Sequence, residues 1–257
     1  MEAMTGIGLS ERFQEHYQDY YEGGDSEWRR RSAAGKAAVI ASLCDGLEPR
    51  AVLELGAGEG SILRCLSERS FAPNLYALEI SPTGVQAILD AGIPGLLESR
   101  IFDGYHVPYE DGKFDLAILS HVVEHVEHPR QLIYEASRVA RHVFIEVPLE
   151  DTARLPRDFV LDPVGHINFY SMKSIRRLVQ SCGLRVTREA ITTPARRAYE
   201  YRSGRKGLLA WAIKETLLRA APKLATLLST YHGALLCERM PQAEVVRGGM
   251  SREYSKG

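Results

Sequence analysis

The sequence predicts an α/β protein built on a doubly wound, mostly parallel sheet. From Ala51 onward, short runs of β-branched and leucine-rich residues alternate with helix-sized stretches, and each run is bounded by glycine, proline, asparagine or aspartate. The runs show little polar alternation, which is typical of strands covered on both faces. Because strands and helices alternate, we expect ligands to bind at the carboxyl ends of the strands.

Seven segments are predicted as strands. They are AVLEL (51–55), NLYALEI (74–80), GLLESRIF (95–102), FDLAILS (114–120), HVFIEVP (142–148), GLRVTREAI (183–191) and HGALLCERM (232–240). Helix signals lie between them: Ser81-Pro82 is an N-cap followed by proline, Gly92 closes that helix, and Ser171 and Gly183 bracket another. If the last two strands pair as a hairpin, the sheet gains an antiparallel edge.

Three further regions complete the predicted organisation. Residues 1–46 form an N-terminal helical region, with helices over Ser10–Tyr21 and Glu27–Cys44 separated by Gly23-Gly24. The main domain covers residues 47–240 and carries a helical insertion over 205–231. Residues 241–257 are polar and are expected to form a flexible tail.

Composition excludes several classes of protein. The chain has 257 residues, 33 acidic and 32 basic, so its formal net charge of −1 argues against a generic nucleic-acid binder. Four scattered cysteines without a CxxC pair predict reduced thiols and no disulfide. The start of the chain lacks a secretory signal, and charged residues interrupt the apolar stretch Leu208–Leu228. We therefore expect a cytoplasmic protein without a transmembrane helix.

The most informative motif is a buried strand that runs into a glycine-rich turn, Val52 to Gly60, and then into a helix. Glu79 ends the next strand, 25 residues after Glu54, where a carboxylate can accept hydrogen bonds from both hydroxyls of a ribose. The following Asp103-Gly104 could accept from an exocyclic amine. No Lys-Ser/Thr follows the glycines, so a phosphate cradle is excluded and a cofactor with adenosine and a cationic centre is favoured. An NAD-type or purely structural turn is the alternative.

With ELGAGEG, LEIS, FDG, FDLAILSHVVEHVEHP and GHINFYS in this order, residues 50–185 resemble class I S-adenosylmethionine-dependent methyltransferases, in particular those acting on small molecules. The resemblance implies a seven-stranded Rossmann-like sheet of order 3-2-1-4-5-7-6 and an N-terminal lid. It also implies a set of cofactor-binding residues: Tyr17, Tyr21, Trp28, Glu54, Gly56, Ala57, Gly58, Gly60, Glu79, Ile80, Asp103, Gly104, Ser120 and His121.

In this set the four loop residues contact the methionine portion, Glu79 the ribose and Asp103-Gly104 the adenine. Ser120 and His121 face the sulfonium, and the aromatic residues close over the cofactor, where a ring face can hold a cation. Packing of the first two helices onto the core is the alternative role for these aromatic residues.

Histidines are the candidate bases. Half of the eight histidines follow the fourth and fifth strands, where the acceptor is expected, and a histidine can take the proton of a hydroxyl near neutral pH. His121 and His166 are the expected catalytic residues, with structural hydrogen bonding as the alternative. HVVEH also matches the HxxEH of a zinc peptidase, but here it follows a strand directly and lacks the long helix.

The same residues suggest a metal. His121, Glu124 and His125 share one face if they occupy a helical turn, and His166 would complete the set. The set resembles the metal sites of small-RNA 3′-terminal 2′-O-methyltransferases and ubiquinone-pathway O-methyltransferases, with His121 in place of a glutamate. This replacement favours zinc or iron over magnesium. A metal-free site with His121 or His166 as the base is the alternative.

Residues 185–206 hold seven basic and two acidic side chains. They form either solvated surface or an anion-binding rim for the acceptor. Nine large apolar residues of the insertion indicate a core-facing or dimer-forming helical pair, not a membrane binder. The predicted function is methylation of a small molecule, most plausibly at a hydroxyl oxygen in biosynthesis. Methylation of an RNA end or a peptide, and a non-catalytic cofactor-binding or scaffold role, are the alternatives.

Overall fold

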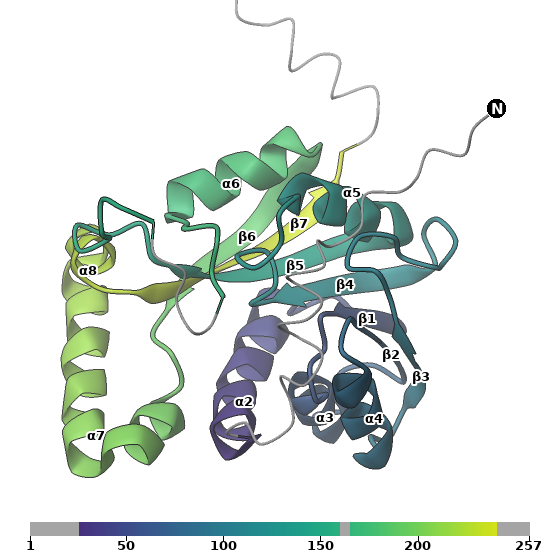
Figure 1. The fold of residues 1–257 in the computed structure, drawn as a ribbon, viewed down its shortest axis with the longest axis horizontal. Helices are drawn as coiled ribbons and strands as arrows, with labels where there is room; N and C mark the ends of the chain where they lie inside the picture. The colour runs from purple at the N-terminus through teal and green to yellow at the C-terminus, as the bar shows by residue number, and fades with distance from the viewer. Residues whose placement is uncertain (1–25, 160–164, 241–257) are drawn as a thin grey trace, which may run out of the picture.

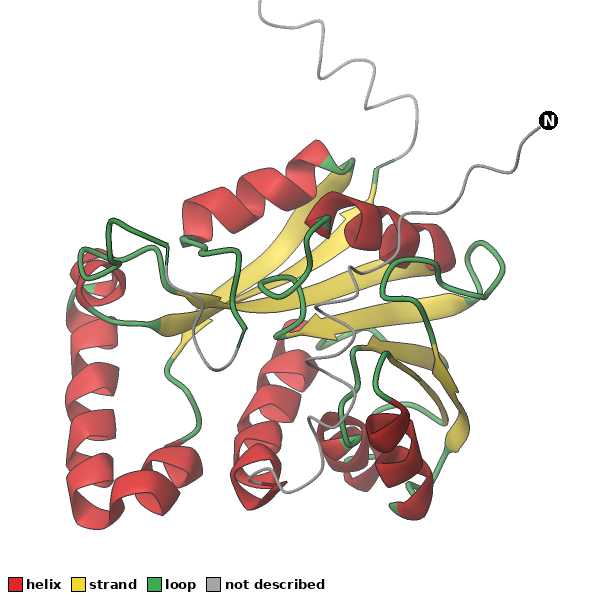
Figure 2. Ribbon diagram, viewed as in Figure 1, coloured by secondary structure: helices red, strands yellow, loops and turns green. Residues whose placement is uncertain are grey.

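A seven-stranded sheet in the order β3-β2-β1-β4-β5-β7-β6 forms the centre of the protein in the computed structural model, which describes residues 26–159 and 165–240 (Figures 1 and 2). Neighbours from β3 to β5 are parallel, whereas β7 is antiparallel to both β5 and β6. The strands are β1 Ala51–Leu55, β2 Asn74–Glu79, β3 Leu96–Ile101, β4 Phe114–Ser120, β5 Ala140–Leu149, β6 Leu184–Thr192 and β7 Tyr231–Arg239. The predicted fold class and strand order are confirmed.

Helices cover both faces of the sheet, so each face has its own apolar core. α2, α3 and α4 lie on one face and α5 and α6 on the other (Figure 1). The helices are α2 Ser26–Leu43, α3 Ser61–Glu68, α4 Pro82–Asp90, α5 Pro129–Val139, α6 Met172–Ser181, α7 Arg196–Ala220 and α8 Pro222–Leu228. This two-sided cover explains the predominantly apolar sequences of β1, β4 and β5.

The predicted helix signals act as expected. The Ser81 hydroxyl accepts a hydrogen bond from the Gly84 amide at 3.3 Å, and Pro82 occupies the first turn of α4. Ser171 and Ser174 form a reciprocal capping box at the start of α6. Each cap satisfies backbone amides that a helix start leaves without a partner.

The helical insertion is longer than predicted and only partly packed. It begins at Arg196 and kinks at Ser203 and Gly204, where Gly204 has φ 52°. Leu209 is 64% exposed and Ile213 60%, so the expectation of a core-facing pair is wrong for these two residues. The reason is that α7 stands apart from the sheet (Figure 1). Leu217 and Leu218, nearer α8, do pack against the core.

Several expectations concern other parts of the chain. The predicted helix Ser10–Tyr21 and the tail 241–257 lie outside the described residues. The four cysteines are free thiols, three of them buried. Within the described ranges, no helix combines the length and apolarity needed to cross a membrane.

Candidate cofactor and acceptor site

A cavity of about 860 Å³ lies at the carboxyl ends of the strands. Its walls come from α2, the glycine loop after β1, the ends of β2, β4 and β5, the start of β7, and the first part of α7. This is where a doubly wound sheet places its ligands, and the volume is in the usual range for small-molecule sites.

The glycine loop is held against β2 by its backbone. The amides of Gly56 and Ala57 donate to the Leu78 carbonyl at 2.8 and 3.1 Å. Gly56 has φ +69°, and a Cβ there would lie 2.6 Å from Cγ2 of Val122. Both the backbone conformation and the lack of space therefore exclude a side chain at this position. Gly58 also lines the cavity, whereas Gly60 turns away and packs against Ile93.

Glu79 ends β2 in the cavity wall with only 2% of its surface exposed. Oε2 accepts the Gly58 amide at 2.8 Å, and Oε1 accepts the amides of Ile80 and Ser81 at 3.0 Å. Burial raises the pKa of Glu79, although these three donors oppose the rise. The residue predicted to bind ribose therefore also shapes the loop that lies beside it.

Glu54 is a buried carboxyl group on which the positive charge of Lys36 acts, and the sequence did not reveal this influence. Glu54 is 2% exposed, its Oε2 has no hydrogen-bond partner, and burial raises its pKa to about 8 although Lys36 lowers it. Lys36 comes from α2, and burial lowers its pKa despite the nearby glutamates. No sequence motif includes Lys36, because it is a single polar residue on a helix that forms part of the cavity wall.

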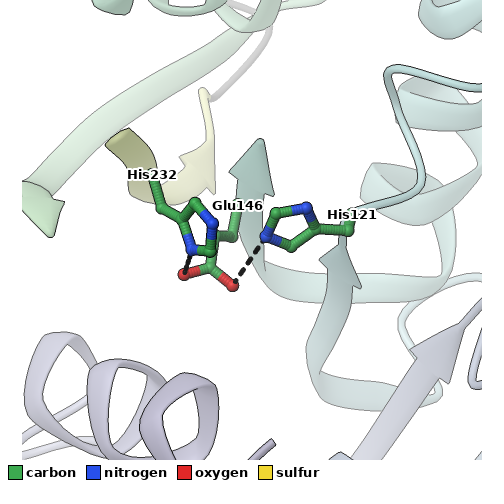
Figure 3. Close-up of side chains that lie close together, drawn as sticks. All are labelled: His121, Glu146 and His232. Carbon is green, nitrogen blue, oxygen red and sulfur yellow. Dashed lines mark ion pairs between the residues drawn. The ribbon is translucent and has the colours of Figure 1, made fainter. Parts of the chain in front are cut away.

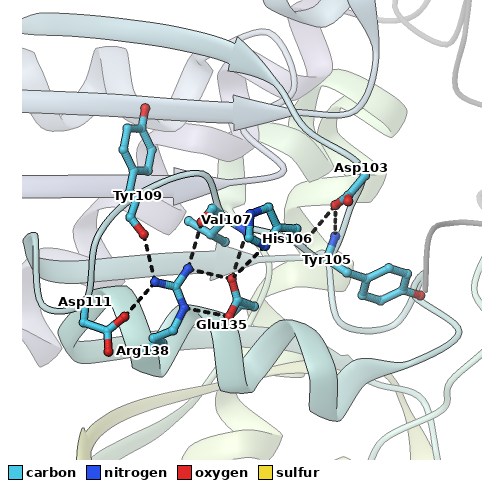
Figure 4. A network of polar contacts seen from close by, with 8 residues as sticks. All are labelled: Asp103, Tyr105, His106, Val107, Tyr109, Asp111, Glu135 and Arg138. Carbon is cyan, nitrogen blue, oxygen red and sulfur yellow. Dashed lines mark hydrogen bonds and ion pairs between the residues drawn. The ribbon is translucent and has the colours of Figure 1, made fainter. Parts of the chain in front are cut away.

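Asp103 does not extend into the cavity. Its Oδ1 accepts the amides of Tyr105 and His106 at 2.9 and 2.6 Å (Figure 4). The same loop is tied to α5 by Arg138, which donates to the carbonyls of Val107 and Tyr109. Asp103 thus caps a turn, and its neighbours Phe102 and Gly104 line the cavity instead.

Of the three aromatic residues expected over the cofactor, Tyr17 and Tyr21 lie outside the described residues. Trp28 lines the cavity, and the guanidinium of Arg202 lies over its ring, 4.9 Å from the ring centroid. This contact joins α2 to α7. A cation from the protein itself therefore occupies a face of this ring.

At the other end of the cavity, two histidines flank a buried glutamate (Figure 3). His121 follows β4, Glu146 belongs to β5 and His232 to β7. Nε2 of His121 lies 3.8 Å from Oε2 of Glu146, and Nδ1 of His232 lies 3.7 Å from Oε1. The predicted His121 thus pairs with two residues that the sequence had not singled out.

Glu124, His125 and His166 form a second group whose ligand atoms lie within 4.8 Å of one another. Nδ1 of His166 contacts Oε2 of Glu150 at 2.7 Å, and the rings of His125 and His166 are 4.8 Å apart. Both oxygens of the fully buried Glu124 lack a hydrogen-bond partner. This group contains three of the four residues predicted as metal ligands.

The expected helical turn that would join His121 to this group is wrong. Residues 121–128 form an irregular turn and α5 begins at Pro129, because His121 adopts a left-handed conformation with φ 59° that a right-handed helix cannot contain. Nδ1 of His121 still lies 3.1 Å from Oε1 of Glu124. Its Nε2, however, faces Glu146, so the predicted set is divided between two groups.

Burial and neighbouring charges shift the pKa values of the titratable side chains in the two groups. Burial, assisted by the charge of Lys36, lowers the pKa of His121 well below its usual value. Burial raises the pKa of Glu124. Burial opposes ionisation of Glu146 too, but His232, His121 and Lys36 together outweigh it and lower the pKa of that carboxyl. Near neutral pH, His121 is therefore an uncharged imidazole and Glu146 a carboxylate.

Most basic side chains of the stretch 185–206 lie outside the cavity. Arg185 pairs with Glu238, and Arg188 donates to the carbonyls of Leu43 and Asp45. Of the seven basic residues of this stretch, Arg202 and Lys206 line the cavity. The anion-binding rim considered for the whole stretch is reduced to these two side chains.

Residues 27–189, more than half of the chain, match the family described as a methyltransferase domain. The protein is a class I S-adenosylmethionine-dependent methyltransferase. The family match implies S-adenosylmethionine as the cofactor of this methyltransferase.

Two curated relatives match shorter segments of this methyltransferase. A probable chloroplastic tocopherol O-methyltransferase of Oryza sativa subsp. japonica is 27% identical over 111 residues, which are 41% of this chain and 30% of the relative. An ajmaline N-methyltransferase of Rauvolfia serpentina is 32% identical over 98 residues, 36% and 33% of the two chains. The matched segments thus span about a third of each relative.

A solved structure agrees over most of the fold. Geranyl diphosphate C-methyltransferase from Streptomyces coelicolor A3(2), in complex with Mg²⁺, geranyl diphosphate and S-adenosyl-L-homocysteine, has a TM-score of 0.60 and 12% sequence identity. The similarity covers 90% of this methyltransferase and all of that chain. At this identity the likeness concerns the fold alone.

Proposed function

We propose that this methyltransferase transfers a methyl group from S-adenosylmethionine to a hydroxyl oxygen of a small molecule. The observation that carries the oxygen acceptor is the histidine–carboxylate pair His166–Glu150, at 2.7 Å, in the cavity wall. A carboxylate on one ring nitrogen orients an imidazole and raises its basicity, as a general base requires. The tocopherol relative supports an oxygen acceptor, and the ajmaline relative keeps nitrogen as the competing outcome.

The residues at the β1 and β2 ends fit the cofactor. We assign the loop Gly56–Gly58 to its methionine portion, Glu79 and Ile80 to the ribose, and Ser120 with His121 to the methyl end. Three backbone amides use three of the about four lone-pair directions of the Glu79 carboxylate, so one direction remains for a ribose hydroxyl. When bound, the cofactor supplies an electrophilic methyl group.

The chain's own residues then have two tasks. Methyl transfer is an in-line displacement, so the walls must hold the acceptor oxygen in line with the methyl group, which can supply several kcal/mol. His166 takes the hydroxyl proton, and Glu150 stabilises the imidazolium that forms. His121, uncharged near neutral pH, presents a neutral imidazole at the methyl end.

The alternative to a histidine base is a divalent ion held by Glu124, His125 and His166, in which case His166 is a ligand and not the base. Glu124 is 0% exposed and neither carboxylate oxygen has a hydrogen-bond donor, which is costly unless a cation or a proton satisfies it. Two imidazoles and one carboxylate suit zinc or iron better than magnesium. A bound ion would lower the pKa of the acceptor hydroxyl.

The test uses the purified chain, labelled S-adenosylmethionine and a panel of phenols, sugar hydroxyls, hydroxy acids and amines, with product mass as the readout. We expect methyl transfer to a hydroxyl, and a loss of about 10²–10⁴-fold in kcat for His166→Ala with cofactor affinity retained. His106→Ala, whose side chain is 74% exposed and outside the cavity, is the control. Cofactor binding without transfer to any small molecule would favour a scaffold or a macromolecular substrate.

The metal is tested separately. The metal content of the purified chain should be lower in His125→Ala than in the wild type. Chelation should lower the turnover of the wild type. Full turnover with no bound metal would leave the metal-free version, with His166 as the base.

A further inference from the structure

We propose that His121, Glu146 and His232 form a second cation site, separate from the group of Glu124, His125 and His166. Their ligand atoms come from three neighbouring strand ends and lie within 4.8 Å of one another. The imidazole rings of His121 and His232 are 4.4 Å apart, and the Glu146 carboxylate lies beneath both (Figure 3). None of these three residues is needed for the base assigned above.

The spacing in this group is too long for hydrogen bonds and suits ligands of one ion. The nitrogen–oxygen distances to Glu146 are 3.7 and 3.8 Å, whereas the hydrogen-bonded pair His166–Glu150 is at 2.7 Å. Ligand atoms about 2.0–2.1 Å from a tetrahedral ion lie roughly 3.3 Å apart. These two distances involve different oxygens of Glu146, but all the ligand atoms lie within 4.8 Å of one another, so contractions of up to about 1.5 Å would bring both nitrogens and the carboxylate onto the ion.

An unsatisfied atom points to a missing ligand. Nε2 of His121, the nitrogen that faces Glu146, is buried and has no hydrogen-bond partner. Glu146 is 1% exposed. A buried ring nitrogen without a partner is rare in folded proteins and costs free energy unless a ligand accepts its lone pair or its proton.

The group is also held in place by contacts outside it. The Ser120 hydroxyl donates to Oε2 of Glu146 at 2.7 Å, and the His121 amide donates to the Glu146 carbonyl at 2.8 Å. The second bond holds His121 in its left-handed conformation, φ 59°, which costs about 1–2 kcal/mol. Orienting contacts and local strain of this kind are typical of metal and active sites.

The ligand set indicates the class of ion. Two imidazoles and one carboxylate favour Zn²⁺, Fe²⁺ or Co²⁺ over Mg²⁺ and Ca²⁺, which prefer oxygen. Lys36 also lies near this group and is attracted most by Glu146, then by Glu124 and Glu54, so the ion would share the negative charge of Glu146 with Lys36. Three protein ligands leave positions open toward the cavity, so water or an oxygen of the acceptor completes the coordination.

The experiment is a titration of the metal-stripped full-length chain with Co²⁺, followed by calorimetry and by its visible absorption. We expect His232→Ala and Glu146→Gln each to weaken one Co²⁺ site at least tenfold. His125→Ala should leave that site unchanged, because it alters only the other group. S-adenosylhomocysteine affinity and circular dichroism report whether each variant is folded. If His232→Ala does not fold, the Co²⁺ affinity of Glu146→Gln decides the test.

Wild-type Co²⁺ stoichiometry and affinity in both His232→Ala and Glu146→Gln would overturn the proposal. No outcome depends on methyl transfer, so failure of the proposed O-methylation is measured separately from failure of this site. A Co²⁺ site lost only in His125→Ala would assign the metal to the group of Glu124 and exclude it here.

Discussion

The two ends of the cavity differ in how their buried carboxylates are hydrogen-bonded. At the ends of β1 and β2, Glu79 accepts three backbone amides and fixes a loop of glycines. At the ends of β4, β5 and β7, Glu146 lies between two imidazoles without a hydrogen bond to either ring. The first end is built from residues close in sequence, and Oε2 of Glu54 is the buried side-chain atom there that lacks a partner among the described residues. The second end is assembled from distant segments, and Nε2 of His121 and both oxygens of Glu124 lack partners there.

This difference indicates which end of the cavity can change its ligand specificity among related methyltransferases. A loop whose backbone is already bonded can bind only the ligand for which it is shaped, so it suits a cofactor common to a family. Side chains with unused donors and acceptors can be satisfied by different acceptors or ions. Each prediction below breaks or sharpens this contrast.

The largest expected effect concerns Glu54, whose pKa of about 8 lies above the ordinary value of 4.5. A raised pKa means that the protonated form is favoured on folding, so its stabilisation is complete below about pH 4.5 and is lost as the pH rises through 8. We expect Glu54→Gln to gain stability relative to wild type across that range, by up to about 5 kcal/mol. Urea unfolding of the cofactor-free protein at several pH values measures it.

Glu48→Gln, at an exposed position, is the matched control and should change stability by less than about 0.5 kcal/mol at every pH. A flat difference between Glu54→Gln and wild type would mean that Lys36 keeps Glu54 ionised throughout.

Next in size is Gly56→Ala. The added Cβ would lie 2.6 Å from Val122 at φ +69°, so strain and overlap together should cost about 2–5 kcal/mol of stability and disrupt cofactor binding. Gly112→Ala is the control, since Gly112 has φ +68° but nothing within 4 Å of the new Cβ. Thermal unfolding should separate the two, and equal losses would show that only backbone strain matters at the loop.

Glu79→Ala should lower affinity for S-adenosylhomocysteine by about 1–3 kcal/mol, roughly 5–150-fold, because the ribose loses its acceptor and the loop loses three bonds. Asp103→Ala should change it by less than about 0.5 kcal/mol, since Asp103 bonds only its own turn. Calorimetry gives both values. Unchanged affinity in Glu79→Ala would refute the ribose assignment, and a large loss in Asp103→Ala would restore its predicted adenine contact.

The smallest effect is expected in the insertion. Leu209→Gln and Ile213→Gln should each alter stability by less than about 0.5 kcal/mol, because both side chains are at least 60% exposed. Leu119→Ala, at a fully buried position of β4, should cost about 2–5 kcal/mol. A large loss in either insertion variant would mean that this surface is covered, and sedimentation would then test for a dimer.

The sequence predicted the fold well because its signals are local. Strand runs, caps and the glycine loop each occupy a few consecutive residues, and the family match covers them. His232 and Lys36 could not be found this way, since they reach the cavity from β7 and α2 and no spacing links them to β4. Glu146 did leave a signal, as the one acidic residue in an apolar strand run.

The false helix at His121 has a comparable cause. Spacings of three and four residues fit a helix, but backbone handedness at one residue decides the turn, and it depends on a bond to β5. The early start of the insertion at Arg196 likewise depends on its packing beside α2.

The roof of the cavity consists of two helices far apart in sequence. Arg202 of α7 lies over Trp28 of α2, and Arg31 of α2 lies 5.1 Å over the ring of Tyr201. Parting the helices breaks both contacts, at about 0.5–1 kcal/mol each. At that cost alone, roughly 3–15% of molecules would be open at equilibrium, and fewer if other contacts also break. Substituting Arg202 or Arg31 is therefore expected to enlarge this open population without changing the residues assigned to the chemistry.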